Sequence, residues 1–150
     1  MKKQAVTGES NRENPGHQSQ ASNQPKPYDR NQTPNRSESW HQMQLIQWAR
    51  QYDWSQYLYH IANETTGGMS WVTRNRQMGC KKGVPDLCLP IPMNGYHGLY
   101  IELKTETGRL SAQQKRWIAA LKQMGYRAEC CKGWQEAKEV IMDYMEVSEC

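Results

Sequence analysis

Three charged side chains interrupt an otherwise apolar part of this sequence. Asp86 directly follows Pro85, and Glu102 and Lys104 lie two residues apart inside the run "GLYIELK". Charged residues are rarely buried in strands unless they are paired, bound to a metal ion or chemically useful. Because residues two apart in a strand point to the same face, we expect Glu102 and Lys104 to lie side by side.

These residue types suit the hydrolysis of a phosphodiester bond. That reaction needs an activated water and groups that stabilise the negative charge developing on the phosphate. Asp86 and Glu102 offer the hard oxygen ligands that suit Mg²⁺ or Mn²⁺, and a bound cation would relieve the repulsion between the two carboxylates. Lys104 can orient the attacking water or stabilise the charge of the transition state.

Each of these residues also has a purely structural interpretation. Glu102 and Lys104 can form an ion pair on a solvated face, and Asp86 can simply begin a strand. Ser111 and Gln114 fit a capping box, in which Gln114 serves the helix N-terminus, although this role is compatible with a role in a site. We expect His60 and His97 to be packed or surface residues rather than ligands.

A hairpin is the element that brings the three charges together. The runs "PDLCLPI" and "HGLYIELK" flank the segment "PMNG", whose Pro, Asn and Gly favour turns. In an antiparallel pair, the start of the first strand lies beside the end of the second. The sequence therefore places Asp86 next to Glu102 and Lys104 at one rim of a sheet.

The remaining pattern predicts helices that cover this sheet. An apolar stripe of Trp117, Ile118, Leu121 and Met124 follows the N-cap Ser111 and ends at Gly125. The expected fold class is α/β, with a mixed sheet of about four strands flanked by helices. Further helices are expected over residues 38–52, 69–79 and 134–145, a further strand over 126–132, and either a strand or an extended run over 57–64.

The first 37 residues differ in composition from the rest of the chain. Their apolar residues are few, so the segment cannot offset the entropy of ordering, and we expect a disordered polar and basic tail over 1–37 and a folded domain over 38–150. Of the formal net charge of +4, +3 belongs to this tail. Any affinity of the domain for nucleic acid must therefore come from local patches.

No targeting or membrane-spanning segment is evident in the sequence, so we expect a soluble, cytoplasmic protein and no membrane partner. The five cysteines are odd in number and lack the spacing of a zinc site. We expect them to be structural thiols.

The motifs together resemble the VRR-NUC family, the virus-type replication and repair nucleases of the PD-(D/E)XK superfamily. The resemblance rests on "GVPDLCLP", "YHGLYIELK", "GRLSAQQKRWIAAL" and "GYRAECCKGWQEAKEVI", joined in order with "HIANE" and "MGCKKGVPD". It covers about residues 38–144 and leaves out the tail. It implies a restriction-endonuclease-like core.

The resemblance also implies a role for individual residues. Asp86 matches the aspartate of the Pro-Asp motif, Glu102 and Lys104 match the Glu-x-Lys pair, and Gln114 matches a glutamine on the helix that follows. Glu38 matches the glutamate that opens the first helix of similar phage-type members. These five are the expected catalytic residues, and Asp86, Glu102 and Glu38 are the expected ligands of Mg²⁺ or Mn²⁺.

The function implied by the resemblance is that of a metal-dependent DNA endonuclease in phage replication, recombination or repair. Small stand-alone members resemble Holliday-junction resolvases, which implies a homodimer that cuts branched DNA and leaves a 5′ phosphate and a 3′ hydroxyl. The expected location is a bacterial or phage-infected host cell. Two alternatives stay open: a catalytically silent nucleic-acid-binding module, and an interaction protein whose working part is the tail.

A basic segment upstream of Asp86 supplies candidates for nucleic-acid contact. The segment "RNRQMGCKKG" contains Arg74, Arg76, Lys81 and Lys82, which could neutralise phosphates. Trp71 could stack on exposed bases, although core packing is the simpler expectation. Nothing resembles a base-reading module, so no sequence specificity is predicted.

Overall fold

The computed structural model of the chain describes residues 36–62 and 68–147. Every described residue belongs to one compact unit, which backbone contacts place within residues 32–150. Nearly all of the predicted tail therefore lies outside the described residues. None of the helices in the described part is long and apolar enough to cross a membrane.

One mixed sheet forms the centre of the fold. Its strands are β1 (Tyr59–His60), β2 (Leu87–Leu89), β3 (Leu99–Lys104) and β4 (Arg127–Lys132), and they lie in the order β1-β2-β3-β4. The pairs β1–β2 and β2–β3 are antiparallel, whereas β3–β4 is parallel. The predicted α/β class with about four strands is confirmed.

The predicted hairpin is the β2–β3 pair. Leu87 pairs with Ile101 and Leu89 with Leu99, while Met93 and Tyr96 bridge at the turn. The two central turn residues, Asn94 and Gly95, have φ of 51° and 80°, as a tight turn that follows the strand twist requires. The turn chemistry of "PMNG" therefore sets the register that aligns the two strands.

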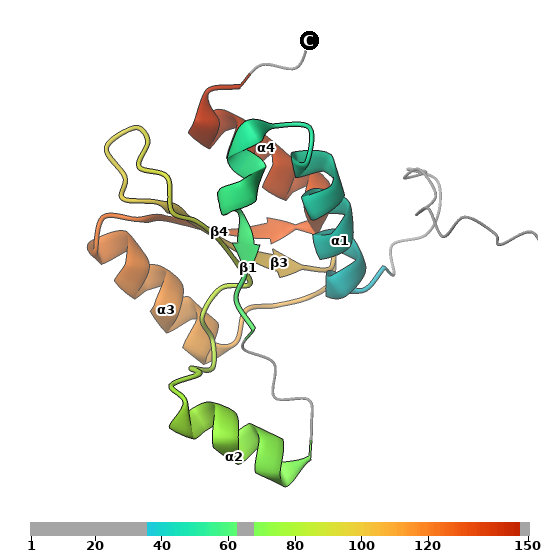
Figure 1. Cartoon of the computed structure of the whole chain (residues 1–150), viewed down its shortest axis with the longest axis vertical. Helices are drawn as coiled ribbons and strands as arrows, with labels where there is room; N and C mark the ends of the chain where they lie inside the picture. The colour runs from blue at the N-terminus through green and yellow to red at the C-terminus, as the bar shows by residue number, and fades with distance from the viewer. Residues whose placement is uncertain (1–35, 63–67, 148–150) are drawn as a thin grey trace, which may run out of the picture. The chain divides into compact units, whose positions relative to one another are not determined.

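The helices divide between the two faces of the sheet. Helices α1 (Glu38–Ala49) and α4 (Gly133–Met145) pack together on one face, and α3 (Ala112–Gln123) lies on the other (Figure 1). Ser37 caps α1, since its Oγ accepts a hydrogen bond from the backbone N of Trp40 at 3.1 Å. Helix α2 (Met69–Gln77) has no buried residue.

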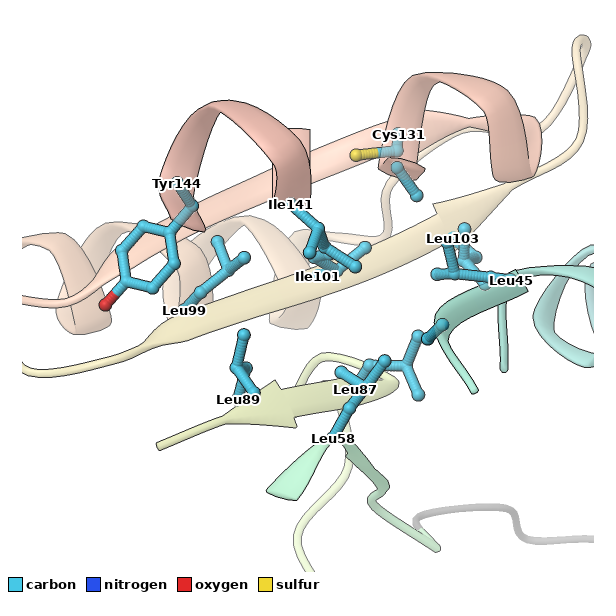
Figure 2. Packing of buried hydrophobic residues seen from close by; sticks show 12 residues of the cluster. Leu45, Leu58, Leu87, Leu89, Leu99, Ile101, Leu103, Cys131, Ile141 and Tyr144 are labelled. Atoms are coloured by element: carbon cyan, nitrogen blue, oxygen red, sulfur yellow. The ribbon is translucent and has the colours of Figure 1, made fainter. Parts of the chain in front are cut away.

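The core lies between the sheet and the α1–α4 pair. Figure 2 shows Leu99, Ile101 and Leu103 on one side of β3, packed toward Ile141 and Tyr144 of α4. Each such side chain contributes roughly 1.5–3 kcal/mol when it is removed from water. Alternation along β3 then directs Glu102 and Lys104 to the opposite face, toward α3.

Two expectations need correction. Within the described part of the segment 57–64, which ends at residue 62, the strand is limited to Tyr59–His60, because a 3-10 helix, η1 (Asp53–Tyr57), ends just before it. In the predicted apolar stripe of α3, only Leu121 is buried, and Met124 is 61% exposed. Helix α3 packs chiefly against β4, and this strand is in contact with only part of the apolar stripe of the helix.

Candidate active site

The ends of β2 and β3 bring Asp86, Glu102 and Lys104 together. Asp86 lies directly before β2, and its Oδ2 accepts a hydrogen bond from the backbone N of Leu103 at 2.8 Å. Glu102 and Lys104 project from the same face of β3, where they are 1% and 6% exposed. The arrangement predicted from the hairpin is thus present.

Lys104 connects two carboxylates from distant parts of the chain. Its Nζ lies 2.7 Å from Oε1 of Glu102 and 3.1 Å from Oε1 of Glu38, and it also donates to the carbonyl of Leu103 at 3.1 Å. Glu38 occupies the first turn of α1, where Ser37 begins the helix. Glu38 therefore belongs to this group of residues through its contact with Lys104.

Gln114 has both of the roles that the sequence left open. Its Oε1 accepts from the backbone N of Ser111 at 2.8 Å, which completes a capping box at the start of α3. Its Nε2 donates to Oε1 of Glu102. The helix cap thereby fixes the side chain that holds Glu102 in place.

Burial changes the protonation of the site. It raises the pKa of Glu102 to about 7, because the effect of burial and the nearby Asp86 charge outweighs the contact with Lys104. Burial also raises the pKa of Asp86, against the opposing effects of the Leu103 N–H and Lys104. Burial alone would lower the pKa of Lys104, but its contacts with Glu102 and Glu38 raise it.

The donor set fits a hard divalent cation that keeps most of its waters. The Oε2 atom of Glu102 is buried and has no hydrogen-bond partner, so an oxygen ligand is available beside Asp86. Within residues 36–62 and 68–147, no three His, Cys, Asp or Glu side chains are grouped around one point, and Glu38 does not complete such a set. Mg²⁺ commonly uses one or two carboxylates together with water and substrate oxygens.

His60 is a neighbour of the site that sequence reasoning missed. Its Nδ1 donates to the backbone carbonyl of Asp86 at 2.9 Å, and the side chain is exposed. This contact follows from the pairing of β1 with β2, in which His60 lies opposite Leu87. No local pattern in the sequence indicates which strand β1 will join. The neighbouring Asn63 and Glu64 lie outside the described residues.

The expected nucleic-acid contacts are all on the surface. Arg74 and Arg76 are exposed on α2, and Lys81 and Lys82 are exposed in the loop that leads to Asp86. Trp71 on α2 is also exposed, at 45%, so it is not a core residue. The backbone carbonyl of Lys82 accepts a hydrogen bond from Nε1 of Trp117 at 3.1 Å, which joins this loop to α3.

The fold is α/β, and Asp86, Glu102 and Lys104 lie together where β2 begins and β3 ends. The model of the VRR-NUC domain matches residues 28–135, and the chain belongs to this family, whose members are generally nucleases. A solved structure described as "VRR_NUC domain protein" is 26% identical and superposes with a TM-score of 0.67, covering 77% of this chain and 93% of the other. No curated protein matches the chain.

Proposed function

We propose that this protein is a metal-dependent endonuclease that hydrolyses DNA phosphodiester bonds. The observation that carries the proposal is Glu102: a buried carboxylate with one unpartnered oxygen, beside Asp86 and Lys104, in a chain of a nuclease family. An isolated buried carboxylate is costly unless something compensates its charge. Ligation of Mg²⁺ or Mn²⁺ by Asp86 and Glu102 would provide that compensation.

The protein groups have separable tasks in this reaction. A divalent cation held there would supply charge stabilisation and lower the pKa of water. The backbone N of Leu103 holds Asp86, and Gln114 holds Glu102, so both carboxylates are oriented before substrate arrives. Lys104, whose ammonium is buried and positioned by three oxygens, orients the attacking water and stabilises negative charge on the phosphate.

We further propose that the enzyme prefers branched or flapped DNA, that it acts as a homodimer in phage replication, recombination or repair, and that it does so in the cytoplasm of a bacterial or phage-infected cell. The resemblance to stand-alone VRR-NUC members supports this part of the proposal. Two active sites related by two-fold symmetry would suit paired cuts in a junction. Sedimentation with and without a four-way junction tests the assembly.

The test of the chemistry is cleavage of labelled linear duplex, single-stranded, flap and four-way-junction DNA in Mg²⁺, Mn²⁺ or EDTA. We expect Asp86→Asn and Lys104→Met to lose at least about 100-fold in rate while remaining folded by circular dichroism. Glu139→Gln is the matched control, because Glu139 is an exposed carboxylate on α4, away from the site, and it should cut normally. Metal-independent cleavage, or full activity of Asp86→Asn, would contradict the proposal.

One observation favours a catalytically silent DNA-binding module instead. Lys104 is already paired with Glu102 and Glu38, which makes a closed ionic network without any cation. This alternative predicts DNA binding that is insensitive to Mg²⁺ and no cleavage of any of the four substrates. Removal of residues 1–37 provides a separate control, since the endonuclease proposal requires the remaining domain to keep cutting.

A further inference from the structure

An open groove of about 390 Å³ lies between α3 and the loop that leads to Asp86. Its size falls within the range of roughly 300–1,000 Å³ that is usual for small-ligand sites. Neither the carboxylates nor Lys104 form part of its wall. It is lined by Lys82, Gln113, Arg116, Trp117, Ala120 and Met124.

The two walls of the groove are fixed against each other. Gly83 has φ +85°, and a Cβ atom there would come within 2.8 Å of Gln113, so only glycine permits this close approach. The hydrogen bond from Nε1 of Trp117 to the carbonyl of Lys82 joins the same walls at 3.1 Å. The shape of the groove is therefore fixed by close packing and a hydrogen bond between its two walls.

The lining combines an aromatic surface with positive charge. Trp117, Ala120 and Met124 provide apolar atoms, while Lys82 and Arg116 provide cations, and no acidic residue lines the groove. The charge extends beyond it, since residues 68–84 and 111–125 contain seven Lys or Arg and no Asp or Glu. A ligand with a flat apolar face and negative charge matches both properties.

The groove also adjoins the proposed active site. Gln113 directly precedes Gln114, which contacts Glu102, and Lys82 lies four residues before Asp86. A base inside a duplex is stacked between its neighbours and exposes only its edges, whereas an unpaired base can stack on an aromatic side chain. Contact between a base and Trp117 therefore requires a nucleotide outside a duplex.

We propose that this groove binds an unpaired nucleotide of the DNA strand next to the cleavage site, with the base on Trp117 and the phosphate beside Lys82 and Arg116. This inference rests on the proposed endonuclease function and specifies its substrate as DNA with a single-stranded segment at the cut. Flaps, gaps and opened junctions meet that requirement, but continuous duplex does not.

The test measures the affinity of the full chain for a labelled single strand and for a duplex of equal length, in EDTA so that no cleavage occurs. We expect Trp117→Ala to weaken single-strand binding by roughly 5- to 100-fold and duplex binding by less than about twofold, with Trp117→Phe intermediate. The logarithm of the binding constant falls linearly with the logarithm of the salt concentration, and Arg116→Ala should make this slope shallower by about 0.7 for the single strand.

Two matched controls exist on the α1 side of the molecule. Met43 and Met124 are 60% and 61% exposed, so Met43→Ala controls for Met124→Ala, and Arg50→Ala controls for Arg116→Ala. The controls should bind the single strand as the wild type does. The proposed subsite is wrong if Arg116→Ala and Trp117→Ala weaken duplex binding as much as single-strand binding. It is also wrong if these variants weaken neither kind of binding. A shift in monomer–dimer equilibrium without any change in DNA affinity would instead assign the groove to protein contact.

Failure of this inference is distinguishable from failure of the endonuclease proposal. If the wild type cuts DNA with Mg²⁺ but groove variants cut flap and duplex in the wild-type ratio, the subsite fails and the endonuclease stands. If nothing is cut but Trp117→Ala still loses single-strand affinity selectively, the subsite stands as part of a silent binding module.

Discussion

The two faces of the sheet have opposite characters. On one face, α1 and α4 bury eight residues between them, whereas α3 on the other face buries only Leu121 (Figure 1). Segments 38–60 and 133–147 carry six Asp or Glu against two Lys or Arg, while residues 68–84 and 111–125 carry only positive charge. One face is densely packed, and the other is thinly covered by α3, whose charged residues are all basic.

This difference shows how one small domain separates stability from binding. The apolar side of β3 is covered by α1 and α4, which hold the strand in place. The charged side of the same strand faces α3, a helix that buries only Leu121 and carries Lys115, Arg116 and Lys122. Because strand side chains alternate, a single strand serves both purposes.

The largest expected difference between the faces is in packing energy. Ile141→Ala, in the core on α4, should lower the free energy of unfolding by about 2–5 kcal/mol, because it leaves a cavity. Met124→Ala, on the exposed side of α3, should change it by no more than about 0.5 kcal/mol. Urea denaturation of both variants measures this, and similar losses would contradict the division of roles.

The second prediction concerns the cost of keeping Glu102 buried. Burial raises its pKa from 4.5 to about 7, so the folded protein holds the Glu102 proton more tightly than the unfolded chain does. The resulting contribution to stability is fully present below pH 4.5 and is lost as pH rises through 7. The loss corresponds to about 3 kcal/mol in the metal-free protein. Glu102→Gln should flatten this part of the stability profile, measured by thermal unfolding in EDTA, whereas Glu139→Gln should leave it unchanged.

The third prediction is an opposite pH dependence of stability, caused by His41 on the α1–α4 face. His41 is buried, its Nδ1 accepts from the backbone N of Trp134 at 3.3 Å, and burial lowers its pKa below 6.5 despite Glu106 and Glu38. His41 therefore binds a proton more readily in the unfolded chain than in the folded protein. As a result, the stability of the folded protein falls as pH drops below 6.5. His41→Gln should reduce this acid-side loss. A variant at the exposed His97 should retain it.

The smallest expected effect is electrostatic and concerns the arginines of α2. Arg74→Ala and Arg76→Ala on α2 should each weaken duplex DNA binding uniformly across sequences. Each should also make the slope of the log binding constant against log salt concentration shallower by about 0.9. Arg50→Ala, an exposed arginine just after α1, should leave the slope unchanged. Equal effects at all three positions would indicate that net charge alone attracts DNA.

Much of the site could be predicted because its signals are local. The turn residues Asn94 and Gly95 set the hairpin register, and the two-residue spacing sets the shared face of Glu102 and Lys104. Helix α3 was also located correctly from its cap, but of its predicted apolar stripe only Leu121 is buried, and Met124 is exposed. An apolar stripe indicates which side of a helix prefers burial, but not how much surface the neighbouring strand can cover.

The sequence by itself determined the helices, the hairpin and the alignment of Asp86 with the Glu102–Lys104 pair, because each depends on residues close along the chain or on strand alternation. Only the tertiary structure decided that Glu38 reaches Lys104, that His60 lies against Asp86, and that the loop at Lys82 packs against α3 to form a groove. These contacts join segments separated by 26 to 66 residues. Their geometry depends on the packing of whole elements, which no local pattern encodes.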